Sequence, residues 1–190
     1  MYFPWQDQNN FLVLKQDVVN TQPWRFAFQI HVSASCFALL AGFTQFFNLF
    51  RNRKLKYIHR TFGYLYIITI LVFALPSGFI LAISSLGGIS TQICFVVLSV
   101  VWGLTTILAV YYALHKKWLK HRNWMIRSFA LTLSALSLRT WKMFLYELQP
   151  YIDWLTPLHI YQIEAWLGWT INLIIAEIII RKMLNTPQKK

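Results

Sequence analysis

Five long apolar stretches, separated by short polar ones, constrain this chain more than any other feature of its sequence. They run from about Arg25 to Phe50, Thr61 to Ser84, Thr91 to Leu114, Trp124 to Leu145 and Tyr161 to Ile180. A helix that crosses the hydrocarbon core of a bilayer needs about 20 predominantly apolar residues, and each stretch reaches that length. The sequence therefore predicts an all-α, polytopic membrane helix bundle with five transmembrane helices.

The charged residues predict the orientation of this bundle. The net charge is +12, and the basic residues gather in 51–60, in 115–122 and after the fifth helix, at Arg181, Lys182, Lys189 and Lys190. The connections 84–88 and 147–164 contain no Lys or Arg. Because positive residues favour the cytoplasmic side, we expect the amino terminus outside and the carboxyl terminus in the cytoplasm. Four basic residues lie on the predicted outer side against this rule, but the basic residues on the inner side outnumber them: Lys15, Arg25, Arg139 and Lys142.

Three parts are expected: an outer-surface segment over 1–23, a transmembrane domain over 24–182 and a basic cytoplasmic tail over 183–190. A chain that is 57% hydrophobic and 13% charged belongs in a membrane, and we expect the plasma membrane. Basic chains also bind nucleic acid, but here the positive charges lie in short clusters between apolar runs, so nucleic acid is not an expected partner. The expected partners are the lipid bilayer and anionic headgroups at its inner face. A membrane-protein partner or a homo-oligomer is left open.

Polar residues follow one face on three of the predicted helices. On the fourth helix they recur at spacings of seven, four and seven residues, at His121, Ser128, Thr132 and Arg139, while Ser134 and Ser137 fall off this stripe. The first helix aligns His31, Ser35, Gly42 and Gln45, and the second aligns His59, Gly63, Tyr66 and Ser77. At about 100° per residue, each set shares a face. Because hydrocarbon offers polar groups no partner, we predict that these three polar seams face the interior of the bundle.

Depth along the helices relates some of these residues to one another. His31 and Arg139 fall in the outer third of their helices, and His59 and His121 fall at the inner boundary. Arg127 and Glu177 both lie near the inner end, where they are placed to form an intramembrane ion pair.

The histidines have two interpretations. Imidazoles at equal depth can ligate a haem iron from both sides, which makes His31, His59 and His121 candidate ligands of a haem b, with Arg139 available to neutralise a propionate. The simpler interpretation is that His59 and His121 meet phospholipid headgroups. An imidazole inside a span, as at His31, is costly and functional by default, although a hydrogen bond to a neighbouring helix would also satisfy it.

No other motif in the sequence indicates a particular reaction. The chain has no glycine-rich phosphate loop, no GxSxG and no HExxH, so whether it is an enzyme is left open. Cys36 and Cys94 have no zinc-site spacing and are expected to be buried thiols. Pro76 is expected to kink the second helix and to free a backbone carbonyl one turn earlier.

Three functional hypotheses follow. The first is a haem-binding or redox-associated membrane subunit, which explains the depth-matched histidines. The second, ranked almost level, is a non-enzymatic assembly or scaffold protein whose seams hold the helices together. The third is a small transporter whose seams line a path, and the small size of the chain argues against it.

Several motifs also match a known family. They are Ala41-Gly42-Phe43, the run from His59 to Tyr66, the HRxWMxRS run that starts at His121, and the run from Ala165 to Trp169. On these motifs the chain resembles the bacterial predicted-membrane-protein family catalogued as domain of unknown function 2306, over roughly Trp24 to Ile180. The resemblance implies a multi-pass membrane protein with no established activity. It singles out His31, His59, His121, Arg127 and Arg139 without implying a role for them.

Overall fold

The computed structural model describes residues 22–46 and 56–185, and within these ranges all regular structure is helical. The elements are α2 (Gln22–Phe46), α3 (Lys56–Ile68), the π-helical turn η4 (Thr69–Ala74), α4 (Leu75–Ile83), α5 (Ile89–Leu114), α6 (Trp118–Thr132), α7 (Ser134–Leu148), the 3-10 turn η5 (Gln149–Tyr151) and α8 (Pro157–Asn185). The all-α prediction is confirmed for this part of the chain. Most of the predicted outer-surface segment and the end of the basic tail lie outside the described residues.

Four helices are long and apolar enough to cross a membrane. They are Pro23–Gln45, the continuous helix Tyr57–Ile83 that α3, η4 and α4 build together, Ile89–Leu114 and Pro157–Asn185. Four of the predicted spans therefore correspond to helices of sufficient length and apolarity.

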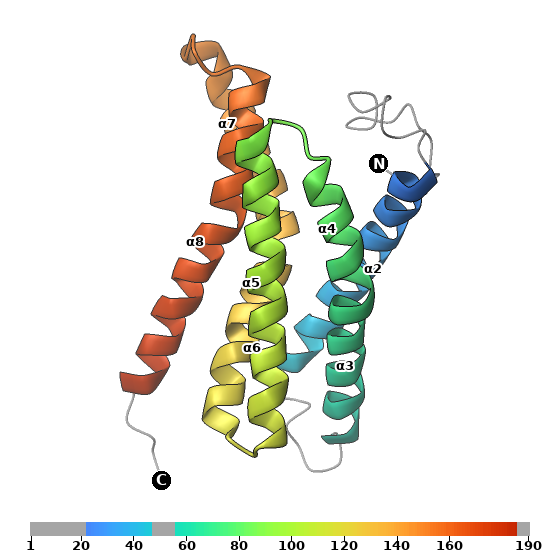
Figure 1. Cartoon of the computed structure of the whole chain (residues 1–190). Helices are drawn as coiled ribbons and strands as arrows, with labels where there is room; N and C mark the ends of the chain where they lie inside the picture. The colour runs from blue at the N-terminus through green and yellow to red at the C-terminus, as the bar shows by residue number, and fades with distance from the viewer. Residues whose placement is uncertain (1–21, 47–55, 186–190) are drawn as a thin grey trace.

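The remaining predicted span, 124–145, falls on two helices of 15 residues each, α6 and α7, which are separated at Leu133. Neither reaches the roughly 20 residues that one crossing needs. In Figure 1, α7 continues from the end of α6, so that together they run along the bundle. Leu133 has ψ −11°, well away from the helical value near −42°. Just before it, Thr132 Oγ1 donates to the carbonyl of Ser128 at 3.0 Å, and this kind of back-bonding bends helices.

The helices expose many large apolar side chains in addition to those that they bury. On α8, Ile174, Ile175, Ile178 and Ile179 are exposed, whereas the buried residues include Glu164, Gly168 and Trp169. Extensive exposed apolar surface marks contact with lipid. Together with the four long apolar helices, this makes the chain a multi-pass membrane protein.

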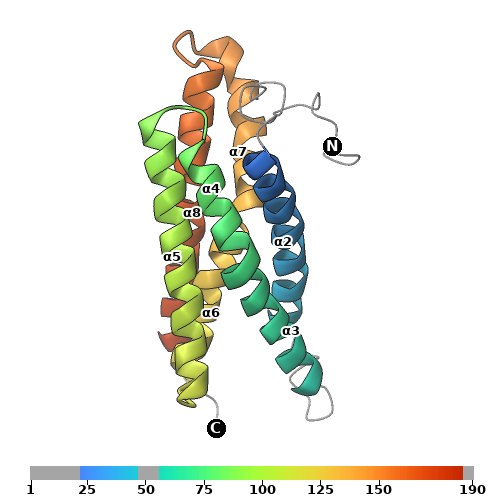
Figure 2. The same cartoon turned by 45° about the vertical axis from the view of Figure 1, so that its right-hand side comes forward.

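Small residues allow the helices to approach closely. A Cβ atom on Gly168 of α8 would lie 2.7 Å from Cγ of Leu138 on α7. Membrane helices use such small residues to pack without a hydrophobic driving force. The packing order is α2 on α3, η4 and α4, then α4 on α5, α5 on α6 and α8, and α7 on α8 (Figures 1 and 2). Cys94 is buried as expected, but the prediction for Cys36 is wrong, because this residue lies on an exposed face of α2.

Candidate functional site

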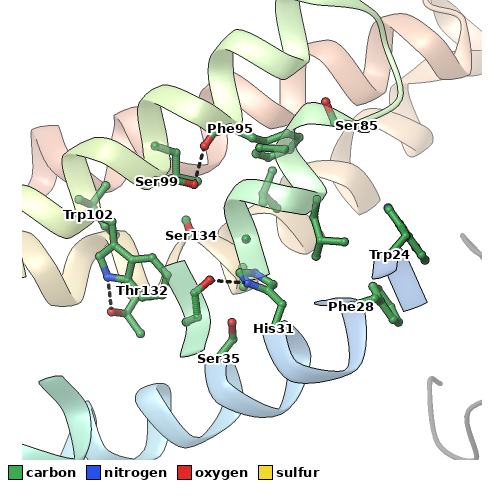
Figure 3. Close-up of a pocket in the computed structure, with 18 of the residues that line it drawn as sticks. Trp24, Phe28, His31, Ser35, Ser85, Phe95, Ser99, Trp102, Thr132 and Ser134 are labelled. Carbon is green, nitrogen blue, oxygen red and sulfur yellow. Dashed lines mark hydrogen bonds between the residues drawn. The ribbon is translucent and has the colours of Figure 1, made fainter. Parts of the chain in front are cut away.

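A cavity of about 210 Å³ lies inside the bundle, between α2, α4, α5, α7 and the outer part of α8 (Figure 3). Its walls carry five aromatic residues, namely Trp24, Phe28, Phe95, Trp102 and Tyr161. Its polar groups are one histidine and five hydroxyl residues, namely His31, Ser35, Ser85, Ser99, Thr132 and Ser134. None of the described residues that line it is Asp, Glu, Lys or Arg. The cavity therefore suits an uncharged occupant.

His31 is held in this cavity by a break in the opposite helix. Its Nδ1 lies 2.9 Å from the carbonyl oxygen of Ala74, the last residue of the π turn (Figure 3). Because a carbonyl can only accept, Nδ1 carries the proton, and in the neutral ring Nε2 is left as an acceptor. Gly78 makes room for the ring, since a Cβ there would lie 2.8 Å from Cε1 of His31.

Around the π turn and Pro76, side chains form hydrogen bonds with backbone carbonyls of the helix. In the turn, the Leu75 N–H bonds the carbonyl of Ile70, five residues back, and Pro76 has no N–H to donate. The Ser77 hydroxyl donates to the carbonyl of Phe73 at 2.5 Å and to that of Ala74 at 3.2 Å. The sequence predicted a kink at Pro76 and a freed carbonyl one turn earlier. The structure has a π turn directly before Pro76, and the carbonyls of Phe73 and Ala74 accept from side chains, with His31 as the partner across the bundle.

Two hydroxyl groups of the cavity carry no hydrogen bond in the described part of the structure. Ser134, at the start of α7, is 8% exposed, and its oxygen is drawn in the cavity in Figure 3. Ser35, on α2 one turn after His31, is half-buried. Both hydroxyl groups are therefore available to donate to or accept from an occupant of the cavity.

The inner side of the cavity is closed by a buried network of hydroxyl groups. Trp102 Nε1 donates to Thr132 Oγ1 at 3.1 Å, and the Tyr66 hydroxyl lies 2.8 Å from the same oxygen. Tyr66 also bonds Ser128 at 2.9 Å, and Ser128 bonds Thr106 at 2.7 Å. Tyr66, Thr106 and Ser128 are fully buried. The network joins α3, α5 and α6 and satisfies these groups without water.

The structure brings three seam residues together in this network: Tyr66, Ser128 and Thr132. Sequence reasoning missed Trp102 and Thr106, which complete it from α5. Their signal was an indole and a hydroxyl one helical turn apart in an otherwise apolar span.

The seam of the fourth predicted helix does not continue past Leu133. Arg139, assigned to the same stripe as Ser128 and Thr132, is exposed, and its Nη1 donates to the carbonyl of Ala135 on its own helix at 2.8 Å. Ser134, assigned off the stripe, lines the cavity instead. Four of the residues of this segment that line the cavity, Leu131, Ser134, Ala135 and Leu138, keep helical spacing across Leu133, so the face toward the cavity lies beside the predicted stripe rather than on it.

His59 and His121 lie near the starts of α3 and α6, away from His31. Ala74, the partner of His31, is fifteen residues beyond His59, or about 22 Å along a helix. His121 Nδ1 lies 2.8 Å from the carbonyl of Ala109. In the orientation that satisfies both ends of its amide, Gln45 donates to the carbonyl and Nδ1 of His59, at 3.2 and 3.1 Å.

Arg127 and Glu177 pair with each other. Arg127 Nε and Nη2 donate to the two carboxylate oxygens of Glu177, at 2.5 and 3.0 Å, and the guanidinium lies 4.6 Å from the centre of the Trp124 ring. This two-point contact ties α6 to α8. Within residues 22–46 and 56–185, no group of three or more His, Cys, Asp or Glu is placed to hold a metal ion.

Comparison with known proteins agrees with this architecture. A model of the family described as predicted membrane protein (DUF2306) matches residues 28–180, which extend from α2 to α8. Searches of curated proteins and of solved structures gave no match.

Proposed function

Since the chain belongs to the DUF2306 family of predicted membrane proteins, we propose that its cavity beside His31 is a binding site for a small uncharged molecule inside the bilayer. The observation that carries the proposal is an unengaged acceptor, His31 Nε2, that shares a cavity without charged lining residues with the Ser134 hydroxyl, which bonds no described residue. Binding sites of this kind are largely apolar, with a few convergent polar groups that orient the ligand.

A purely structural role accounts for the rest of the polar interior better than it accounts for the cavity. The groups of Tyr66, Ser128 and Thr132 satisfy one another, so they support the scaffold hypothesis locally. His31, by contrast, uses only Nδ1 in a hydrogen bond within the described part of the protein. Its Nε2 bonds no described residue and is available to a ligand in the cavity.

The haem hypothesis receives less support. His31 faces a cavity of about 210 Å³, below the roughly 300–1,000 Å³ that drug-sized ligands occupy, and haem is larger than most of these. Arg139 is turned outward. At His59, the Gln45 amide donates to Nδ1, which leaves the proton on Nε2 and no free lone pair for iron. A Soret band in the purified protein would revive this hypothesis at His59 and His121.

A transport path is also less well supported. The hydroxyl network and the fully buried side chains of Ile70 and Leu131 close the interior on the inner side of the cavity. A solute would have to break several buried hydrogen bonds at once to pass.

We further propose five crossings of the plasma membrane, with the amino terminus outside. The tandem arrangement of α6 and α7 supports the fifth crossing. The start of α3, the basic turn between α5 and α6 and the end of α8 lie at one end of the bundle, where they meet anionic headgroups, and the connections without Lys or Arg lie at the other (Figures 1 and 2).

Ligand-induced stabilisation tests the binding function. The purified protein is heated in detergent with a series of small neutral probes, namely phenol, benzyl alcohol, glycerol and octanol. A ligand at 100 times its dissociation constant adds about 2.7 kcal/mol of stability, which raises the unfolding temperature measurably. His31→Phe and Ser134→Ala should abolish the shift, whereas Ser33→Ala, on the exposed face of α2, should preserve it. A shift that survives in the first two variants, or no shift with any probe, contradicts the proposal.

A further inference from the structure

We infer that the ligand of this cavity is a hydroxyl-bearing aromatic ring, such as a phenol or quinol headgroup, and that it arrives sideways from the bilayer between α2 and α7. The inference rests on the proposed binding function and narrows it to one ligand class and one route.

The size and walls of the cavity favour a single ring. An apolar cavity of about 150 Å³ accommodates benzene, and about 210 Å³ leaves space for a hydroxyl and small substituents. Two aromatic pairs contribute to the walls. Trp24 and Phe28 stack at 5.3 Å with an angle of 8°, and Phe95 and Tyr161 lie 6.3 Å apart at 59°. Aromatic rings pack well against such surfaces in stacked or tilted arrangements.

The polar groups favour a hydroxyl on that ring. Because Nδ1 of His31 is committed to Ala74, its Nε2 needs a donor. The free hydroxyl of Ser134 can donate in return. A phenolic O–H both donates and accepts, so it can satisfy both groups at once. A quinone carbonyl or an ether offers no donor to His31, and a carboxylate or an amine would bring a charge that no lining residue neutralises.

Hydrogen bonds join neighbouring helices on two sides of the cavity. On the outer side, Trp24 Nε1 donates to Ser84 Oγ at 2.8 Å, which joins the start of α2 to the end of α4. Gln162 Nε2 donates to the carbonyl of Gly87 at 2.9 Å, which joins α8 to the turn after α4. On the inner side, the network of Tyr66 closes the interior.

The lateral wall between α2 and α7 is different. His31 and Ser35 line the cavity from α2, and Ser134, Ala135 and Leu138 line it from α7. The helix α2 packs on α3, η4, α4 and α6, whereas α7 packs on α8, α6 and η5, and among the described helices no interface of comparable extent joins α2 to α7. A ring that carries a hydrocarbon tail can therefore lie in the cavity while the tail stays in lipid.

Four matched probes test the ligand class. Phenol, anisole, cyclohexanol and toluene are titrated into protein in lipid nanodiscs, with the unfolding temperature and tryptophan fluorescence as readouts. Phenol should bind at least tenfold more tightly than the other three. This preference should disappear in His31→Phe and persist in Ser33→Ala. If anisole or cyclohexanol binds as tightly as phenol, the ring-hydroxyl inference is wrong while the binding function stands. If no probe binds, including glycerol and octanol, both are wrong.

A tailed probe tests the route. 4-Dodecylphenol, supplied in the bilayer and corrected for its partitioning, should bind within tenfold of phenol and compete with it. Ala135→Phe, which fills the α7 side of the wall, should weaken 4-dodecylphenol at least tenfold more than phenol. If phenol binds but 4-dodecylphenol does not, or if Ala135→Phe affects the two equally, lateral access is wrong.

Discussion

Asn172 of α8 donates a hydrogen bond from its side-chain nitrogen to the carbonyl oxygen of Ala130 on α6, at 3.0 Å. Its side-chain oxygen accepts from the Ser137 hydroxyl on α7 at 2.9 Å. One amide thus holds both sides of the break at Leu133. Ser134, which lines the cavity, lies between these two contacts along the chain, so a residue outside the cavity supports one of its walls.

Asn172→Ala should destabilise the protein by about 1–3 kcal/mol, because it removes two hydrogen bonds and leaves partly buried groups on both helices unpaired. The measurement is unfolding in a detergent mixture. Asn185→Ala, at the exposed end of α8, is the control and should change stability little. Equal losses in the two variants would argue against the bridging role of Asn172.

Tyr66→Phe should destabilise the protein by about 0.5–2 kcal/mol while leaving its helical content unchanged. The substitution keeps the ring and removes only the hydroxyl that bonds Ser128 and Thr132, and interhelical hydrogen bonds in membranes are worth about this much. Tyr64→Phe removes an equivalent hydroxyl from an exposed position and should be neutral. The free energies of unfolding of the two variants are compared directly.

Gly78→Ala should weaken probe binding at His31 at least tenfold. The added Cβ would lie 2.8 Å from Cε1 of His31, so the ring must move from its bond to Ala74. Gly63→Ala is the control, because its Cβ would meet Gln45 at an ordinary 3.4 Å. Titration of phenol followed by fluorescence gives both affinities, and unchanged binding in Gly78→Ala would show that the ring position does not matter.

Exchanging the charges of Arg127 and Glu177 should restore part of the stability that single substitutions in this ion pair remove. Arg127→Glu and Glu177→Arg each place two like charges beside one another, so each single variant should destabilise the protein. The double variant Arg127→Glu with Glu177→Arg should recover part of the summed loss of the two single variants in a double-mutant cycle. A double variant as unstable as the sum of the singles would show no coupling.

A membrane-impermeant maleimide should label Thr156→Cys in intact cells and should label Lys117→Cys only after the cells are opened. Both positions are exposed, and they lie at opposite ends of the proposed topology. The unsubstituted chain, which contains Cys36 and Cys94, measures the background. The reverse pattern would invert the orientation.

Several features were predictable because they depend on neighbours in sequence. The apolar runs predicted the helices of α2, α5 and α8 and the continuous helix from α3 to α4, since hydrophobicity and helical period are local properties. The periodicity of Tyr66, Ser128 and Thr132 placed them toward the interior, and these groups bond one another there. Lipid cannot satisfy polar groups, so a polar face on an apolar helix has one direction to turn.

The site itself was decided by the tertiary structure. Which nitrogen of His31 is free depends on Ala74, a residue of another helix, and on the π turn that precedes Pro76. The position of Ser134 in the cavity and that of Arg139 outside it depend on how α6 and α7 pack on the neighbouring helices. Helical periodicity indicates which residues share a face, whereas contacts between helices decide which face lines a cavity, and the sequence alone does not record those contacts.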